Sequence, residues 1–368
     1  MIQALITRGV HIPAPEAIVL ENIDIERIKP GVTLYPGTVL RGPKTYIGKN
    51  ATIGLGGGAF IDNAQIGERA QIMQGVYRNC TMLADVVVRN GAEIREGTLL
   101  EEGVELGHTV GLKQTIMLSH VVAGSLINFC DALMAGGTSR KNHSEIGSCM
   151  ALYNFTPQGD KFASCFGDAE NGVFLKQKPI FIGGQTQIVS PVKIGYGSVI
   201  AAGSKLTQNV DNDQLIVKSP TDLQTQFDAE AIYAPDRKIL ATQHYIYQLK
   251  ILRHWYLNVR LKLYAGTEQE ILMTAALGQI ESGLEERQKR LQKFINKLPK
   301  SLNVHEKSGN IKQVQTHQTA LNLAQKEIEL SPDSPFMQHN FDDIVTQLKS
   351  HISQGLSYPE AVSRLLFS

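Results

Sequence analysis

Residues 181–206 read FIGGQTQIVSPVKIGYGSVIAAGSKL, and every sixth residue of this stretch is aliphatic, beginning with Ile182 and ending with Leu206. An amphipathic helix needs apolar residues three and four apart, and a half-buried strand needs them two apart. A period of six fits neither pattern alone. It is typical of a solenoid in which three short strands and three turns make one coil of about 18 residues.

The same period extends over most of the first 220 residues. Small or β-branched residues often stand two positions earlier, as Ala92 and Thr98 do. The pattern predicts a mainly β fold, a left-handed parallel β-helix of hexapeptide repeats over residues 1–220, with the aliphatic side chains on its axis. These residues are Ile28, Leu34, Leu40, Ile47, Ile53, Ile66, Ile72, then an unbroken run of Val76, Met82, Val88, Ile94, Leu100, Leu106, Leu112 and Leu118, and finally Ile182, Ile188, Ile194, Ile200 and Leu206.

The period ends near Pro220, where helix-forming residues take over. Residues 221–368 are therefore expected to form an all-α C-terminal domain. Its first helix has an apolar seam in steps of three and four and ends at Gly266. Thr267 with Glu270 is interpreted as a capping box that opens a second helix, which Pro299 closes. A linker is expected at 300–310, followed by helices near 311–330, 341–353 and 359–366. The apolar seam of the first helix consists of Tyr245, Leu249, Leu252, Tyr256, Val259 and Leu263.

Composition and charge exclude several classes of protein. Lys and Arg total 36 against 35 Asp and Glu, so no net charge attracts a nucleic acid. No run of about 18 apolar residues is present to span a membrane. The four cysteines share no CxxC spacing, which favours a reducing cytoplasm; they are Cys80, Cys130, Cys149 and Cys165.

Several blocks of the chain occur in an order seen in a known enzyme family. They are GVHIPAPEAIVLENIDIERIKPGVTLYPGTVLRGPKTYIGKNATIG, AEIREGTLLEEGVELGHTVGLK, the NH pair in RKNHSEIG, and IFIGGQTQIVSPVKIGYGSVIAAGSKLTQNV. Together they resemble the acetyltransferase domain of the bifunctional glucosamine-1-phosphate acetyltransferase and N-acetylglucosamine-1-phosphate uridyltransferase, over roughly residues 10–218. Uridyl transfer is not expected, because the Gly-rich phosphate-binding signature of the family's other domain is absent from this sequence.

The resemblance puts Arg95 and Lys113 at the positions that hold the sugar phosphate. They are 18 residues apart, so one coil separates them and they are expected to stack on one edge as a phosphate clamp. The alternative is that Arg95 and Lys113 are two solvated surface charges that bind no ligand.

The resemblance also offers a general base for acyl transfer, a role that suits a neutral imidazole near neutral pH. RKNHSEIG resembles the family's Asn-His block, which makes Asn142 a substrate-binding residue and His143 the base. In a second alignment MAGGTSRKN matches a later segment and Met117 takes the base position. His120 is then the nearest imidazole and the alternative base.

The stretch YNFTPQGDK resembles the family's amino-sugar loop. Asn154 and Lys161 agree with it as substrate-binding residues, whereas Phe155 replaces a tyrosine. A loop insertion near 155–179 breaks the period and is expected to form a lid or wall over a site.

The resemblance places the acyl carrier, coenzyme A, along the last coils beside Gly184 and Ala202. These residues are also 18 apart and are expected to stack. Where the family has an arginine for the nucleotide phosphates this chain has Ser219, so Lys218 is the nearest candidate.

The sequence therefore predicts a transfer of an acyl group from acetyl-CoA or another acyl-CoA to an amino sugar, as its phosphate or nucleotide. A non-catalytic sugar-nucleotide-binding or scaffold protein is the alternative. A zinc hydro-lyase is a third class, but His108, His120 and His143 lack paired spacing, so no metal is expected. By analogy with this fold, the expected assembly is a homotrimer with sites between prisms.

Overall fold

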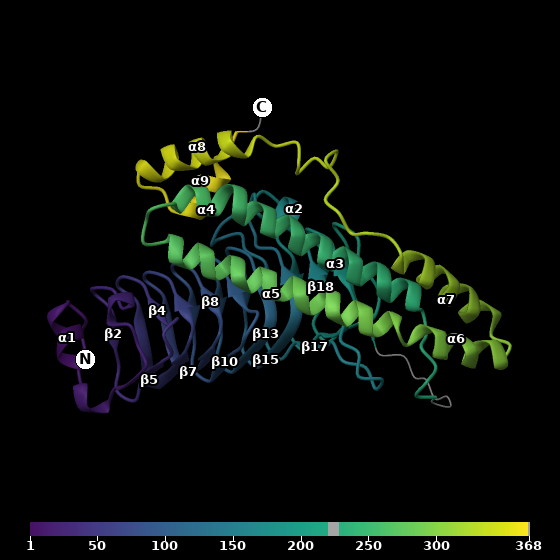
Figure 1. Cartoon of the computed structure of the whole chain (residues 1–368), viewed down its shortest axis with the longest axis horizontal. Coiled ribbons are helices and arrows are strands. Elements are labelled where there is room, and N and C mark those ends of the chain that lie inside the picture. The colour runs from purple at the N-terminus through teal and green to yellow at the C-terminus, as the bar shows by residue number, and fades with distance from the viewer. Residues whose placement is uncertain (220–227, 367–368) are drawn as a thin grey trace.

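The computed structural model describes residues 1–219 and 228–366. Its first part is a prism of stacked triangular coils, the left-handed parallel β-helix predicted by the period (Figure 1). Each coil contributes a strand to each of three flat faces, and the strands of neighbouring coils pair in parallel, as Ile182 does with Ile200. The predicted boundary at Pro220 lies outside the described residues.

Face 1 takes its strands from the part of each coil that carries Ile182 and Ile200. Its strands are β2 (Thr33–Leu34), the first half of β5 (Thr52–Asp62), the first half of β7 (Gln71–Arg78), β9 (Val87–Val88), β12 (Glu105–Leu106), β14 (Val122–Ala123), β16 (Glu145–Ile146), β19 (Phe181–Ile182), β22 (Val199–Ile200) and β24 (Leu215–Ile216).

Face 2 follows face 1 along the chain. It contains β1 (Val19–Glu21), β3 (Val39–Arg41), the second halves of β5 and β7, β10 (Ala92–Ile94), the first halves of β13 (Val110–Met117) and β15 (Ile127–Met134), β17 (Ala151–Tyr153), β20 (Gln187–Val189) and β23 (Lys205–Leu206).

Face 3 completes the triangle. It contains β4 (Tyr46–Ile47), β6 (Gln65–Ile66), β8 (Thr81–Met82), β11 (Leu99–Leu100), the second halves of β13 and β15, β18 (Ser164–Phe166) and β21 (Lys193–Ile194).

The aliphatic ladder fills the axis of the prism, but its period slips at both ends of the run predicted to be unbroken. Tyr77 rather than Val76 is fully buried and pairs with Ile94 on the next coil. Further on, Met117 rather than Leu118 pairs with Leu100, because Met117 follows the axial Leu112 by five positions rather than six. The prediction of an unbroken run from Val76 to Leu118 is therefore wrong in register, although Leu118 is itself buried.

The helices form the second part of the molecule. They comprise α3 (Pro235–Trp255), a π-helical turn (Tyr256–Arg260), α4 (Leu261–Tyr264), α5 (Glu270–Ile295), α6 (Leu298–Lys307), α7 (Ile311–Ala324), α8 (Phe341–Ser353) and α9 (Tyr358–Ser363); α1 (Ile2–Thr7), two 3₁₀ turns (Pro15–Ala17 and Ile25–Arg27) and α2 (Ala169–Gly172) belong to the first 220 residues.

Figure 1 shows α3 and α5 running side by side along the prism, with α6 and α7 beyond its far end and α8 and α9 folded back over α4. Helix α5 contacts β6, β8 and β11, and α3 contacts β18. All four strands belong to face 3, so the tail covers this face. The predicted seam from Tyr245 to Leu263 is buried in this contact.

The tail departs from its prediction at two places. Residues 300–310 are largely helix α6, because Ser301 and His305 turn inward and bind the backbone of Ile232. The predicted capping box does not form either. Thr267 Oγ1 donates to the carbonyl of Tyr264, and the Glu270 carboxylate accepts from the N–H of Gly266.

The segment predicted as a loop insertion, 155–179, is interrupted by a strand of the prism. Residues 164–166 form β18, which pairs with β15 and β21 on face 3. The short helix α2 then leaves the prism and contacts α3, where Gln248 accepts a hydrogen bond from the N–H of Ala169. Part of the segment is therefore covered by the tail.

Among the helices that the structure describes, each is too short or too polar to cross a membrane.

Candidate functional site

The three corners of the prism sort the predicted site residues into three groups. Residues that leave face 2 for face 3 lie on one corner, the 2–3 corner, and the 3–1 and 1–2 corners are defined in the same way. Since strands of one face align coil by coil, residues that follow the same face stack along the same corner. The predicted groups follow this rule: Arg95, Lys113 and Asn154 on the 2–3 corner, His120, Asn142 and His143 on the 3–1 corner, and Gly184, Ala202 and Lys218 on the 1–2 corner.

The 3–1 corner carries a cavity of about 710 Å³. One wall is the prism, with Leu83, His120 and Arg140. The opposite wall comes from the tail, with Met273 of α5 and Tyr358 of α9. A volume of this size is ordinary for a small-molecule pocket.

His120 lies in the wall of this cavity. Its Nδ1 is buried and has no hydrogen-bond partner within the described residues. Burial lowers the pKa of His120, and the nearby His143 acts in the same direction, while Glu102 and Glu360 oppose it. The imidazole is therefore neutral at neutral pH, the form that can accept a proton.

His143 lies beside His120, on the next coil, and its ring has a hydrogen-bond partner. Its Nδ1 lies 2.9 Å from the carbonyl oxygen of Arg140. A carbonyl only accepts, so Nδ1 carries the hydrogen and Nε2 has the free lone pair in the neutral ring. Nε2 is 3.5 Å from a carboxylate oxygen of Glu145. The contact with Arg140 fixes the orientation of the ring, as a general base requires, and Nε2 faces the Glu145 carboxylate.

Asn142 does not point a free amide at the cavity. Its Nδ2 donates to Thr138 Oγ1 at 2.7 Å, and its backbone N–H donates to the carbonyl of Ser139. Thr138 and Ser139 both line the cavity. Asn142 thus shapes the loop next to the two histidines.

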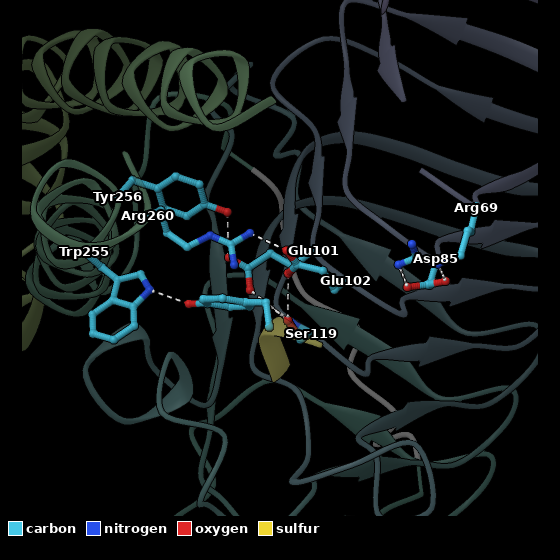
Figure 2. A network of polar contacts seen from close by, with 9 residues as sticks. Arg69, Asp85, Glu101, Glu102, Ser119, Trp255, Tyr256 and Arg260 are labelled. Carbon is cyan, nitrogen blue, oxygen red and sulfur yellow. Dashed lines mark hydrogen bonds and ion pairs between the residues drawn. The ribbon is translucent and has the colours of Figure 1, made fainter. Parts of the chain in front are cut away.

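Beneath the cavity a buried polar network joins prism to tail (Figure 2). Arg260 is fully buried and reaches Glu102 at 2.5 Å. Tyr256 donates to Glu101 at 2.8 Å, and Ser119 donates to both carboxylates. The guanidinium carbon of Arg260 also stacks 3.6 Å from the ring centre of Tyr358, which receives a hydrogen bond from the Trp255 indole. This network therefore fixes α9 and the π-helical turn against the corner that carries His120. It consists of two adjacent carboxylates, one arginine and three aromatic rings.

On the 2–3 corner Arg95 and Lys113 stack on adjacent coils as their spacing predicts. Lys113 binds Glu96 at 2.5 Å, and Nε of Arg95 is buried without a hydrogen-bond partner in the described residues. Further along this corner Asn154 donates to Asp131, which also pairs with the buried Arg287 of α5. The predicted sugar-binding residues thus share a corner, but α5 takes part in their contacts.

The amino-sugar loop itself projects from the 2–3 corner. The backbone of Phe155 forms an antiparallel β-bridge with that of Lys161 across the loop, and Phe155 is 62% exposed. Lys161 lines a smaller cavity of about 220 Å³ with Phe294 and Lys297 of the helical tail. Along this corner, β15 lies between the strand that carries Lys113 and the strand that leads into this loop.

The predicted carrier residues stack at the far end of the prism. The N–H of Gly203, next to Ala202, donates to the carbonyl of Gly184, and the carbonyl of Lys218 accepts from Lys205. These residues flank face 1, whose other edge is the 3–1 corner with His143. One face of the prism therefore separates carrier residues from the candidate base.

Sequence reasoning missed Glu102, Arg260 and Tyr358. Arg260 lies on the apolar seam that the period of α3 predicts, so a charged residue in a buried stripe was the available signal. Its partner, 158 residues earlier, has no such signal. Within the described residues, no group of three or more His, Cys, Asp or Glu side chains is placed to hold a metal.

No family model matches the chain. Its sequence is 29% identical over 214 residues to the bifunctional protein GlmU of Pelobacter propionicus, covering 58% of this chain and 42% of that protein. The chain is similar to the acetyltransferase part of GlmU. The GlmU of Thermotoga maritima is 27% identical over 57% of this chain. The chain spans 42% of the length of both GlmU proteins.

Solved structures were also compared. The UDP-N-acetylglucosamine acyltransferase from Bacteroides fragilis covers 75% of this chain and 94% of its own, at 16% identity and a TM-score of 0.22. The polysialic acid O-acetyltransferase OatWY covers 58% of this chain and 89% of its own, at 12% identity and a TM-score of 0.18. Such low scores do not relate the site of either enzyme to this one. The sequence similarity to GlmU is the finding that bears on function.

Proposed function

We propose that this chain is a coenzyme A-dependent acyltransferase that acylates an amino sugar in its phosphate or nucleotide form. The observation that carries the proposal is the oriented imidazole of His143, whose Nδ1–H is held by the backbone carbonyl of Arg140. The similarity to GlmU over more than half of the chain supports the reaction class.

The chemistry follows from that geometry. The sugar amine attacks the thioester carbonyl carbon, so a C–N bond forms and the C–S bond breaks. His143 Nε2 takes the amine proton and can pass it to the departing thiolate. His120, neutral and one coil away, is the alternative base.

The assembly that we propose is a homotrimer. Phe181, Val199 and Leu215 align on successive coils of face 1 and are exposed, which supports a contact between prisms there. The sugar-binding and carrier corners of one chain lie apart from its histidines, and a neighbouring prism would supply the missing corner. We place the reaction in the cytoplasm, because all four cysteines are unpaired.

The test measures thiol release from acetyl-CoA and longer acyl-CoAs with a panel of amino-sugar phosphates and UDP-amino sugars. The expected result is acceptor-dependent release that His143→Ala abolishes. Absence of any protein-dependent release across the panel would refute the proposal.

The separation of the predicted groups onto three corners favours a second candidate, a non-catalytic binder of sugar nucleotides. Thermal-shift measurements separate the two, because a ligand specific for the folded state raises its stability. Stabilisation by UDP-sugars without stabilisation by coenzyme A indicates the binder, and stabilisation by both indicates the transferase.

A further inference from the structure

The cavity at the 3–1 corner has an apolar interior. Leu83 of the prism and Leu272 and Met273 of α5 are buried in its walls. Ile352 and Leu356, at the end of α8 and just after it, close it from the tail side and are half-buried. A hydrocarbon chain is buried favourably against these side chains, which offer no hydrogen-bond partner to a polar group.

The rim of the cavity is charged and exposed. Arg69 is already paired with Asp85 and Glu68, and Arg140 with Glu105. The Glu360 carboxylate, also at the cavity, accepts hydrogen bonds from the backbone and hydroxyl of Ser357.

Lys141 lies on the same rim, and among the described residues no carboxylate pairs with it. It is exposed and adjoins the loop of Asn142 and His143. An apolar interior with an available cation at the mouth suits a ligand with a hydrocarbon tail and an anionic head.

We propose that this cavity binds the acyl chain of the donor, so that the preferred donor is a medium-chain acyl-CoA rather than acetyl-CoA. The inference rests on the proposed acyltransferase function. The acyl chain lies among the apolar side chains of α5 and of the end of α8, and the thioester lies at the rim beside His120, with His143 on the next coil. Lys141 faces the anionic part of the donor.

Binding of decanoyl-CoA, acetyl-CoA and free coenzyme A to the full chain, by isothermal titration calorimetry, tests this without turnover. Decanoyl-CoA is expected to bind at least about tenfold more tightly than acetyl-CoA, since each buried methylene favours binding. Equal affinities overturn the inference. Acetyl transfer to an amino sugar in that case leaves the proposed function standing, so the two failures are distinguishable.

Ile352→Trp fills the cavity and is expected to weaken decanoyl-CoA binding to about the affinity of acetyl-CoA, so that the preference is lost. Its matched control is Ile311→Trp, at a site 72% exposed on the other end of the tail. A preference that survives in folded Ile352→Trp overturns the placement. If that variant fails to fold, Leu356→Trp, from the adjoining turn, gives the same reading.

Lys141→Glu tests whether the cation at the rim of the cavity binds the anionic part of the donor. It is expected to weaken decanoyl-CoA binding several-fold, with an effect that shrinks at high salt. Lys312→Glu, an exposed charge reversal on α7, is the control and should change nothing. Unchanged binding by Lys141→Glu overturns the role given to this cation.

Discussion

Arg260 leaves the π-helical turn fully buried and meets Glu102 of the prism at 2.5 Å. Its Nε and Nη1 have no hydrogen-bond partner in the described residues, but the guanidinium stacks on Tyr358. A charge so enclosed is tolerable only because a carboxylate and an aromatic face replace the water that it lost.

Arg260→Ala is expected to lower the free energy of unfolding by about 3–5 kcal/mol, because it leaves two buried carboxylates without a cation. Chemical denaturation measures this. The control is Arg253→Ala, which removes an exposed pair with Glu281 and should cost less than about 1 kcal/mol. Equal losses in the two variants would contradict the role of the buried network.

Glu101 gives the network a pH dependence. Burial raises the pKa of its carboxyl above the ordinary 4.5, although Arg260 opposes the shift. From that ordinary value up to the raised one, the folded state binds more protons than the unfolded state, so the stability from this group falls as pH rises.

Glu101→Gln is expected to remove this loss. Urea unfolding at about pH 4 and about pH 8 should show the variant gaining stability relative to wild type at the higher pH. The prediction is wrong if the difference between the two proteins is the same at both pH values.

His143→Ala is expected to reduce turnover by about 10²–10⁴-fold with little change in acceptor KM, as for loss of a general base. Steady-state kinetics measure this, with the exposed His108→Ala as control. If His120→Ala alone shows the loss, the base is His120. Full turnover by both variants would remove the histidines from the mechanism.

At the scale of elements, period six predicts the prism because each axial residue makes its contacts within its own coil and with the next one. The period does not contain the two local slips. Tyr77 takes the axial place in its coil, and Met117 follows the axial Leu112 by five positions rather than six. Spacing nevertheless places Arg95 over Lys113 and Gly184 over Ala202 correctly.

Helix α6, by contrast, is an element that the local sequence did not predict. The stretch 300–310 has the polar composition of a linker, yet its few inward residues meet partners far away in the sequence. Ser301 Oγ accepts from the N–H of Ile232, and His305 Nε2 donates to the carbonyl of the same residue. Tertiary contacts of this kind override local propensity.

Leu100, in β11, tests how tightly the prism is packed. It is fully buried between Met82 and Met117 of the neighbouring coils. Leu100→Ala is expected to cost about 2–5 kcal/mol of unfolding free energy, measured by denaturation. Leu240→Ala, at a position 51% exposed on α3, should stay within about 0.5 kcal/mol. Equal costs would contradict the packing.

At the scale of the whole molecule, prism and tail share one hydrophobic core. It runs from Ile28 and Leu100 of the prism to Leu249 and Ile280 of the helices. The face 3 strands under α3 and α5 would be exposed without the tail. The two parts therefore depend on each other for burial.

One thermal transition is expected for the full chain, because neither part keeps its buried surface when the other unfolds. Differential scanning calorimetry measures this. A prism transition well separated from that of the tail would contradict the shared core.

The sequence by itself determined the prism, most of its axial residues and the stacked pairs along its corners, because a solenoid repeats a contact that reaches only one coil away. It also placed the long helices through their apolar seam. Only the tertiary structure decided that the tail covers face 3 and that Arg260 reaches Glu102. It also decided that His120 and Tyr358 share a cavity. Those contacts join residues far apart in the sequence, 158 positions for Arg260 and Glu102. Packing and charge across the interface choose the partners, and no local period records them.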